Sequence, residues 1–201
     1  EAAKFYKIKP IFKDNKCIHS SAALGMYVKS TVAKFEQSAD SSINMSHCVY
    51  HKDMSKSQKE GILSVAKKMW KDRINPNSKV LATHDTYLKL FQLSKPVLEY
   101  SVIYMDEYQD STSCVIDIIT NQQHAKVIVV GDSRQAIYQW RGSTNGLETF
   151  NGVTCTLSRS FRFGQAVANI AQIVLKNKVK VFGTNTIDSK IRPLIAPITS
   201  A

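Results

Sequence analysis

The chain has 201 residues, of which 43% are hydrophobic and 21% charged, a composition that allows a buried core and excludes a wholly disordered segment. Its 27 Lys and Arg against 16 Asp and Glu give a formal net charge of +11, which favours a polyanionic partner such as a nucleic acid but also suits a solvated Lys-rich surface. No apolar run reaches the length of a bilayer span and no secretory leader opens the chain, so we expect a soluble protein of the cytoplasm or nucleus, neither secreted nor in a membrane.

The first half of the chain is polar and rich in Lys and Ser, with apolar residues at helical spacing. One amphipathic helix is predicted around residues 22–35 and another around residues 62–70, separated by loops over residues 37–57. A third helix is predicted over residues 85–92. Thr83 or Asp85 would cap it and Pro96 would follow its end.

The second half changes to short apolar runs with β-branched residues. The runs at 101–105 and 126–130 are predicted strands, and residues 111–120 between them a capped helix. Strand, helix and strand within about 30 residues form a βαβ unit, whose two strands we expect to be parallel and buried. A third strand is predicted over residues 153–157 and an apolar helix over residues 165–175.

Two acids, Asp106 and Glu107, follow the first predicted strand directly, in the sequence DEYQD. In open parallel sheets, ligands bind beyond the carboxyl ends of the strands. One carboxylate there can hold Mg²⁺, which prefers oxygen ligands, while the other polarises a water that attacks a phosphate. Taken alone, the pattern also fits an acidic loop after a strand.

The sequence GDSRQAIYQWRG, at residues 131–142, follows the second predicted strand, so we expect it at the same edge of the sheet. An amide such as that of Gln135 can sense a terminal phosphate. The rings of Tyr138 and Trp140 can stack on unpaired bases, at about 1–3 kcal/mol per base. Both rings could instead be core aromatics beside a turn.

These sequences resemble motifs of superfamily 1 DNA helicases of the UvrD/PcrA/Rep kind. DEYQD is similar to their motif II, GDSRQAIYQWRG to motif III, and LSRSFRFG at residues 157–164 to motif IV. The SFRFG form, with the sequence at residues 84–96, resembles the F-box DNA helicase branch in particular. The resemblance implies an α/β fold: a partial RecA-like parallel sheet of the P-loop NTPase type, with a helical subdomain and the start of a second motor domain.

The resemblance also implies which residues serve the cofactors, ATP and Mg²⁺. Asp106 would ligate Mg²⁺, Glu107 would activate the attacking water, and Gln135 would contact the γ-phosphate. Phe161 would lie on the adenine. Arg162 would place positive charge on the transferring phosphoryl group from the second motor domain, as an arginine finger does.

A further set of residues would bind single-stranded DNA, the implied partner together with duplex junctions. Tyr138 and Trp140 resemble the pair that stacks on bases, and Arg141 would link this segment to the nucleotide. Gln109 and Asp110 would hold the loops of motifs II and III together. No membrane partner is implied.

Four segments follow from the same resemblance. We expect a lead-in over residues 1–19, a helical subdomain resembling domain 1B over residues 20–80, a RecA-like part with motifs II and III over residues 81–157, and motif IV with the start of a second motor domain over residues 158–201.

The sequence departs from the family most in what it lacks. No GxxxxGK[ST] phosphate-binding loop occurs in it, nor do the later family motifs, so we expect the parent protein to be an ATP-dependent DNA helicase and this chain alone to be inactive. A non-catalytic nucleic-acid-binding or assembly module descended from a helicase is the alternative. A metal-dependent nuclease is weaker, because it would need further spaced carboxylates.

Two weaker patterns lie in the first half. Cys17 and His19, with His47, Cys48 and His51, match no standard zinc knuckle, and the absence of CxxC favours reduced thiols. Basic clusters at residues 4–16 and 67–73 can follow a DNA backbone or form solvated faces.

Overall fold

The computed structural model describes residues 2–138, 142–176 and 178–185. The chain divides into two compact units, Glu1–Phe150 and Asn151–Ala201. The segment limits expected from the sequence, at residues 19, 80 and 157, stay a prediction. Over the described residues, no helix is both long and apolar enough to cross a bilayer.

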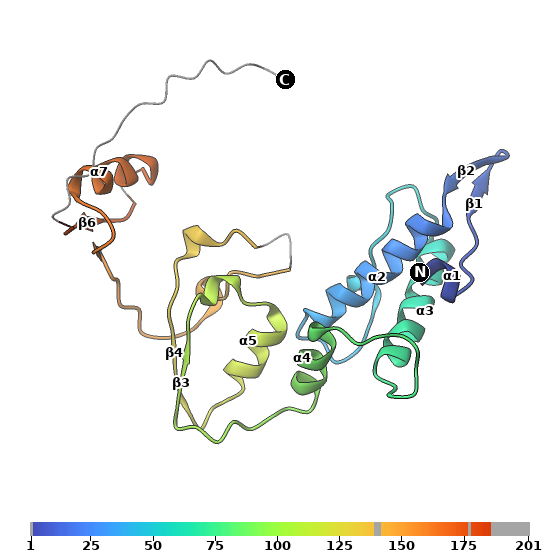
Figure 1. The fold of residues 1–201 in the computed structure, drawn as a ribbon, viewed down its shortest axis with the longest axis horizontal. Helices are drawn as coiled ribbons and strands as arrows, with labels where there is room; N and C mark the ends of the chain where they lie inside the picture. Colours follow the sequence, from blue (N-terminus) through green and yellow to red (C-terminus); the bar gives the residue numbers. More distant parts are fainter. Residues whose placement is uncertain (1, 139–141, 177, 186–201) are drawn as a thin grey trace, which may run out of the picture. The chain divides into compact units, whose positions relative to one another are not determined.

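The first part of unit 1 is mainly helical (Figure 1). Its elements are α1 (Ala2–Phe5), β1 (Ile11–Lys13), β2 (Lys16–His19), α2 (Ser21–Glu36), the 3₁₀ helix η1 (Met45–His47), α3 (Lys56–Arg73) and α4 (His84–Leu93). The three predicted helices are confirmed. Thr83, not Asp85, caps α4: its hydroxyl accepts a hydrogen bond from the backbone N–H of Thr86.

The core of this part lies between α2 and α3. Val28, Val32 and Phe35 of α2 are almost completely buried, and Ala66 and Met69 of α3 are buried as well. Met26, which the predicted apolar stripe of α2 includes, points outward and is 67% exposed. The buried stripe of α2 has the spacing i, i+4, i+7 that places side chains on one face.

A buried ion pair connects three helices. Nη1 of Arg73, at the end of α3, donates to both carboxylate oxygens of Glu36, at the end of α2, over 2.7 Å each. The hydroxyl of Thr86 in α4 donates to Oε1 of Glu36 over 2.6 Å. Because the pair is nearly inaccessible to water, it fixes the ends of α2 and α3 against α4.

The predicted βαβ unit is present. β3 (Val102–Met105) and β4 (Lys126–Val129) pair in parallel without a register break, and α5 (Ser113–Thr120) connects them. The prediction that both strands are buried is wrong: Tyr104 is 71% exposed and Val102 39%. Each strand has a single partner in the described parts of the chain, so the sheet there has only two strands and its faces are incompletely covered.

Short elements follow these strands and complete unit 1. They are the 3₁₀ helices η2 (Tyr108–Asp110) and η3 (Ser133–Gln135), and α6 (Gly146–Thr149). Unit 1 is therefore a mixed α/β structure.

Unit 2 contains β5 (Arg159–Ser160), α7 (Gln165–Val174) and β6 (Phe182–Gly183), with β5 and β6 parallel. The predicted helix is confirmed as α7. The predicted strand over residues 153–157 is wrong: that segment forms no ladder, and Val153 is 97% exposed. Its β-branched residues have no neighbouring strand to pair with, and pairing begins two residues later.

Candidate nucleotide site beyond β3 and β4

The two acids of DEYQD lie at the carboxyl end of β3, and both are exposed. Glu107 adopts φ 50° and ψ 39°, the left-handed region that non-glycine residues seldom enter. The N–H of Glu107 donates to Oδ1 of Asp106 over 2.9 Å. This sharp turn ends β3 and directs the next side chain, that of Tyr108, into the core, where it is fully buried.

Gln109 connects the acids to the loop that follows β4. Its Nε2 donates to Oε2 of Glu107 over 2.7 Å, and its Oε1 accepts from the backbone N–H of Asp132 over 3.1 Å. The side chain is 1% exposed. A Cβ atom on Gly131 would lie 2.2 Å from Oε1 of Gln109. Only a residue without a side chain therefore leaves room for the amide. The expected role of Gln109 in holding the two loops together is confirmed.

Asp132 extends this connection to Gln135. The Nε2 of Gln135 donates to Oδ2 of Asp132 over 3.0 Å, while Oδ1 of Asp132 accepts from the N–H of Arg134 over 3.0 Å. Gln135 is exposed. Glu107 and Gln135 are thus linked through two intermediate residues. For Asp110 the linking role stays a prediction: its Oδ2 lies 3.5 Å from Nε2 of Gln109.

The segment that follows the β4 loop packs back against the β3 loop. The N–H of Thr144 donates to the carbonyl of Ser111 over 3.1 Å. Gly146 lies under the ring of Tyr108, where an added Cβ would be 2.8 Å from Cε1, and the Phe150 ring packs edge-on at 5.7 Å. Burial raises the pKa of Tyr108, which acts here as a packing residue beneath both loops.

The predicted DNA-contacting residues are only partly within the described chain. Tyr138 is 41% exposed, so it is not a core aromatic, and its stacking role stays a prediction. Trp140 and Arg141 lie outside the described residues, so their roles stay predictions.

Phe161 and Arg162 belong to unit 2, directly after β5. Both are exposed, and Phe161 is 79% so. The N–H of Arg162 donates to the hydroxyl of Ser160 over 3.3 Å, and Nδ2 of Asn185 donates to the carbonyl of Phe161 over 3.2 Å. Their contacts with adenine and phosphate stay predictions.

Residues 70–151, which contain both loops, match the UvrD/REP helicase N-terminal domain. This chain belongs to the UvrD-like helicases. It is 32% identical over 175 residues to the F-box DNA helicase protein 1 of Schizosaccharomyces pombe, covering 83% of this chain and 20% of that protein. It is 35% identical over 179 residues to F-box DNA helicase 1 of Gallus gallus, covering 79% of this chain and 18% of that one.

The similarity to bacterial relatives is shorter. ATP-dependent DNA helicase PcrA of Bacillus subtilis is 32% identical over 105 residues, which is 46% of this chain and 14% of PcrA. The chain thus spans about a fifth of the length of the F-box helicases that it matches.

The donor atoms of this UvrD-like site fit a magnesium ion carried with a nucleotide. The described residues contain no group of three or more His, Cys, Asp or Glu that could hold a metal by themselves. Mg²⁺ needs no such group, because it keeps several waters and takes one or two carboxylates together with phosphate oxygens. Asp106, exposed at the end of β3, can supply one carboxylate oxygen of that kind.

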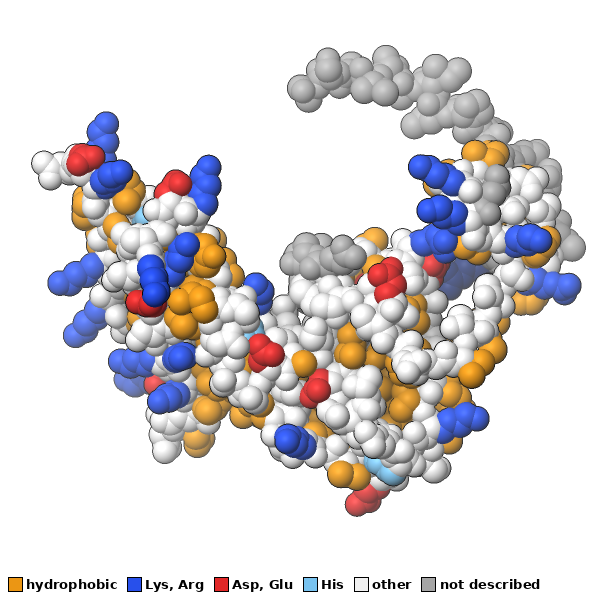
Figure 2. Space-filling view, turned by 180° about the vertical axis from the view of Figure 1, so that it is seen from behind, with side chains coloured by type: hydrophobic (Ala, Val, Ile, Leu, Met, Phe, Trp, Pro, Cys, Tyr) orange, Lys and Arg blue, Asp and Glu red, His pale blue; other side chains and the backbone are white. Residues whose placement is uncertain are grey.

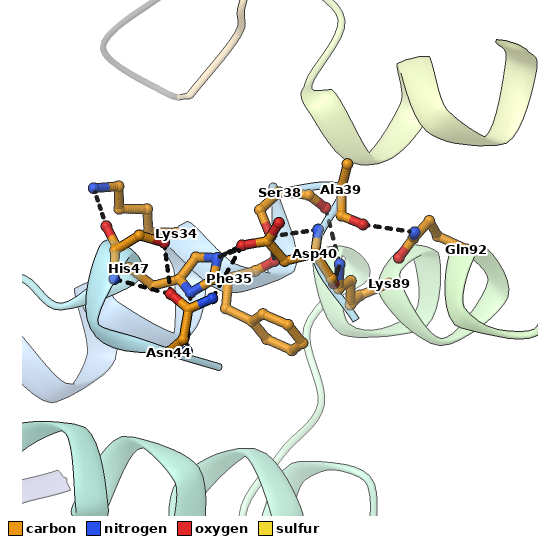
Figure 3. Close-up of polar contacts among 10 residues, drawn as sticks. Lys34, Phe35, Ser38, Ala39, Asp40, Asn44, His47, Lys89 and Gln92 are labelled. Carbon is orange, nitrogen blue, oxygen red and sulfur yellow. Dashed lines mark hydrogen bonds and ion pairs between the residues drawn. The ribbon is translucent and has the colours of Figure 1, made fainter. Parts of the chain in front are cut away.

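A buried polar cluster that no sequence motif indicates lies between α4 and the loop after α2 (Figure 3). Lys89 is completely buried: its ammonium donates to the carbonyls of Ser38 and Asp40 and lies 4.5 Å from the centre of the Phe35 ring. His47 lies 3.0 Å from the Asp40 carboxylate. The cluster fixes the loop between α2 and η1 against α4, which leads into β3.

The unusual feature of α4 is that its polar residues face inward. Thr86, Lys89 and Gln92 are buried, at spacings of three, while Tyr87 and Phe91 are 59% and 45% exposed. The three-residue spacing was available in the sequence. That spacing alone does not predict the cluster, because the cluster also depends on the loop carbonyls that accept the hydrogen bonds.

Proposed function

We propose that this chain is part of an ATP-dependent DNA helicase that couples ATP hydrolysis to movement on single-stranded DNA and to duplex unwinding. The observation that carries the proposal is the buried amide of Gln109, which joins Glu107, the proposed catalytic base, to Asp132 of the loop after β4. A loop that senses phosphate and a carboxylate that activates water need fixed positions relative to each other. One buried side chain, that of Gln109, fixes them here.

In the hydrolytic step, Glu107 orients and deprotonates the attacking water. Its left-handed backbone and its hydrogen bond with Gln109 hold the carboxylate in one position. Asp106 would hold Mg²⁺, and the ion would supply positive charge to the phosphates. Gln135 reads the γ-phosphate, and its bond to Asp132 connects that contact with Gln109.

Coupling to DNA uses the segment after η3. Tyr138 and Trp140 stack on bases, and Arg141 connects them with the nucleotide. Arg162 and Phe161, in unit 2, serve the nucleotide from a second motor domain. In this proposal β3 and β4 are strands of a RecA-like sheet, and residues 20–80 form its helical subdomain.

The chain by itself is expected to show no meaningful ATPase activity, because its sequence contains no loop to cradle the β-phosphate. The test uses a longer protein that includes such a loop. Its ATP hydrolysis, measured with and without single-stranded DNA, should rise when DNA is added, and a forked duplex should be unwound only with ATP. Hydrolysis that is indifferent to DNA would contradict the motor proposal. DNA binding without any hydrolysis would instead favour the non-catalytic binding module.

A further inference from the structure

A β-hairpin projects from the helical part of unit 1 (Figure 1). β1 and β2 pair antiparallel, and Asp14 and Asn15 form its two-residue turn with φ 49° and 62°. Positive φ at both positions is typical of the tight turn that matches strand twist. At the base, Ile11 packs against the core and His19 is 7% exposed, its ring 5.3 Å from that of His51. The base is therefore anchored and the tip is free to make contacts.

The two faces of the hairpin tip differ in chemistry. Lys13 and Lys16 are register partners, so their side chains lie next to each other on one face. Like charges in this position destabilise a hairpin, and no ion pair within 4 Å involves either lysine anywhere in the described chain. Phe12, paired with Cys17, lies on the opposite face and is 61% exposed. An anion between the lysines would relieve their repulsion.

The charge of the surrounding surface favours a polyanion. Residues 1–80 carry 15 Lys and Arg against 7 Asp and Glu, a net of +8 out of the +11 for the whole chain. Figure 2 shows many of these basic side chains spread over the N-terminal helices and the hairpin. Such a field attracts a phosphate backbone, and exposed aromatic rings offer stacking faces to its unpaired bases.

We propose that the hairpin Ile11–His19 is a DNA-contacting element. The ammonium groups of Lys13 and Lys16 hold backbone phosphates on one face, and the ring of Phe12 stacks on an unpaired base on the other. The identity of the polyanion as DNA rests on the proposed helicase function. The hairpin contact itself is separate from the nucleotide site.

The test measures DNA binding by the whole chain. Fluorescence anisotropy reports the affinity for a short single strand, a blunt duplex and a forked duplex. The double variant K13Q/K16Q should weaken binding to all three about tenfold or more at low salt. It should also reduce the slope of log K against log salt by about 1.4 to 1.8, since each neutralised phosphate contributes about 0.7 to 0.9. The control K29Q/K79Q removes two exposed lysines of the same unit and should change the slope much less.

Phe12→Ala tests the stacking face. It should weaken binding to the single strand and the fork by at least about fivefold, the lower end of the loss when an aromatic stacking partner is removed, and affect the blunt duplex less. Unfolding midpoints should be unchanged or slightly raised in all these variants, because the substituted side chains are exposed.

If K13Q/K16Q behaves like its control, or the unaltered chain binds none of the probes, the hairpin proposal is overturned. If F12A binds as the unaltered chain does, its stacking part is overturned. None of these outcomes bears on ATP hydrolysis in the longer protein, so the helicase proposal fails or stands separately.

Discussion

Replacing Gln109 with alanine should lower the free energy of unfolding by about 2–3 kcal/mol. The side chain is 1% exposed and makes two strong contacts, to the Glu107 carboxylate and to the N–H of Asp132. A hydrogen bond to a charged group contributes about 1.5–3 kcal/mol and a neutral one about 0.5–1.5 kcal/mol. Because Glu107 is exposed, the lower part of the combined range applies.

Urea denaturation followed by circular dichroism measures this loss. Gln135→Ala is the matched control, since it removes the same kind of side chain, also bonded to Asp132, from an exposed position. It should cost less than about 0.5 kcal/mol. Equal midpoints for Q109A and Q135A would refute the idea that the buried amide holds the two loops together.

Three further results are expected. Glu36→Gln should cost about 3–5 kcal/mol in urea denaturation, because it leaves the buried guanidinium of Arg73 without its counter-charge; a loss below about 1 kcal/mol would contradict this. Burial lowers the pKa of His47 below its ordinary 6.5, and Asp40 offsets only part of that shift. The contribution of His47 to the free energy of unfolding should therefore be fully present above about pH 7 and be lost as the pH falls from 6.5 towards the lowered pKa. In denaturation measured at a series of pH values, His47→Gln should flatten this dependence. Burial raises the pKa of the Cys114 thiol to about 11, so thiol-specific labelling with mass mapping should find it protected until the chain unfolds, whereas exposed thiols react in the native chain. The exposed thiols are Cys17 and Cys155.

Local signals predicted the longer helices and the unit formed by β3, α5 and β4. α3 followed from apolar residues at helical spacing, and the parallel pairing of β3 with β4 followed from two apolar runs separated by a helix. These predictions succeed because they depend on periodicity and on the short connection between elements.

The predictions that failed depend on neighbours distant in the sequence. β3 is partly exposed because strand burial requires further strands, and β-branched residues at 153–157 form no strand without a partner. Lys89 is buried because carbonyls about 50 residues earlier in the chain accept its hydrogen bonds. No local pattern contains that information.

For the site, the motifs placed Glu107 and Gln109 correctly relative to the end of β3. What the motifs could not give was the conformation that makes the link: the left-handed backbone at Glu107 and the space that Gly131 leaves for the amide.

The most direct test of the proposed motor is Glu107→Gln in a longer protein that contains a phosphate-binding loop. Turnover of ATP with single-stranded DNA should fall by about 10²- to 10⁴-fold, the usual contribution of a general base, while ATP affinity stays close to that of the unaltered protein. Retained turnover would show that Glu107 is not the water-activating acid.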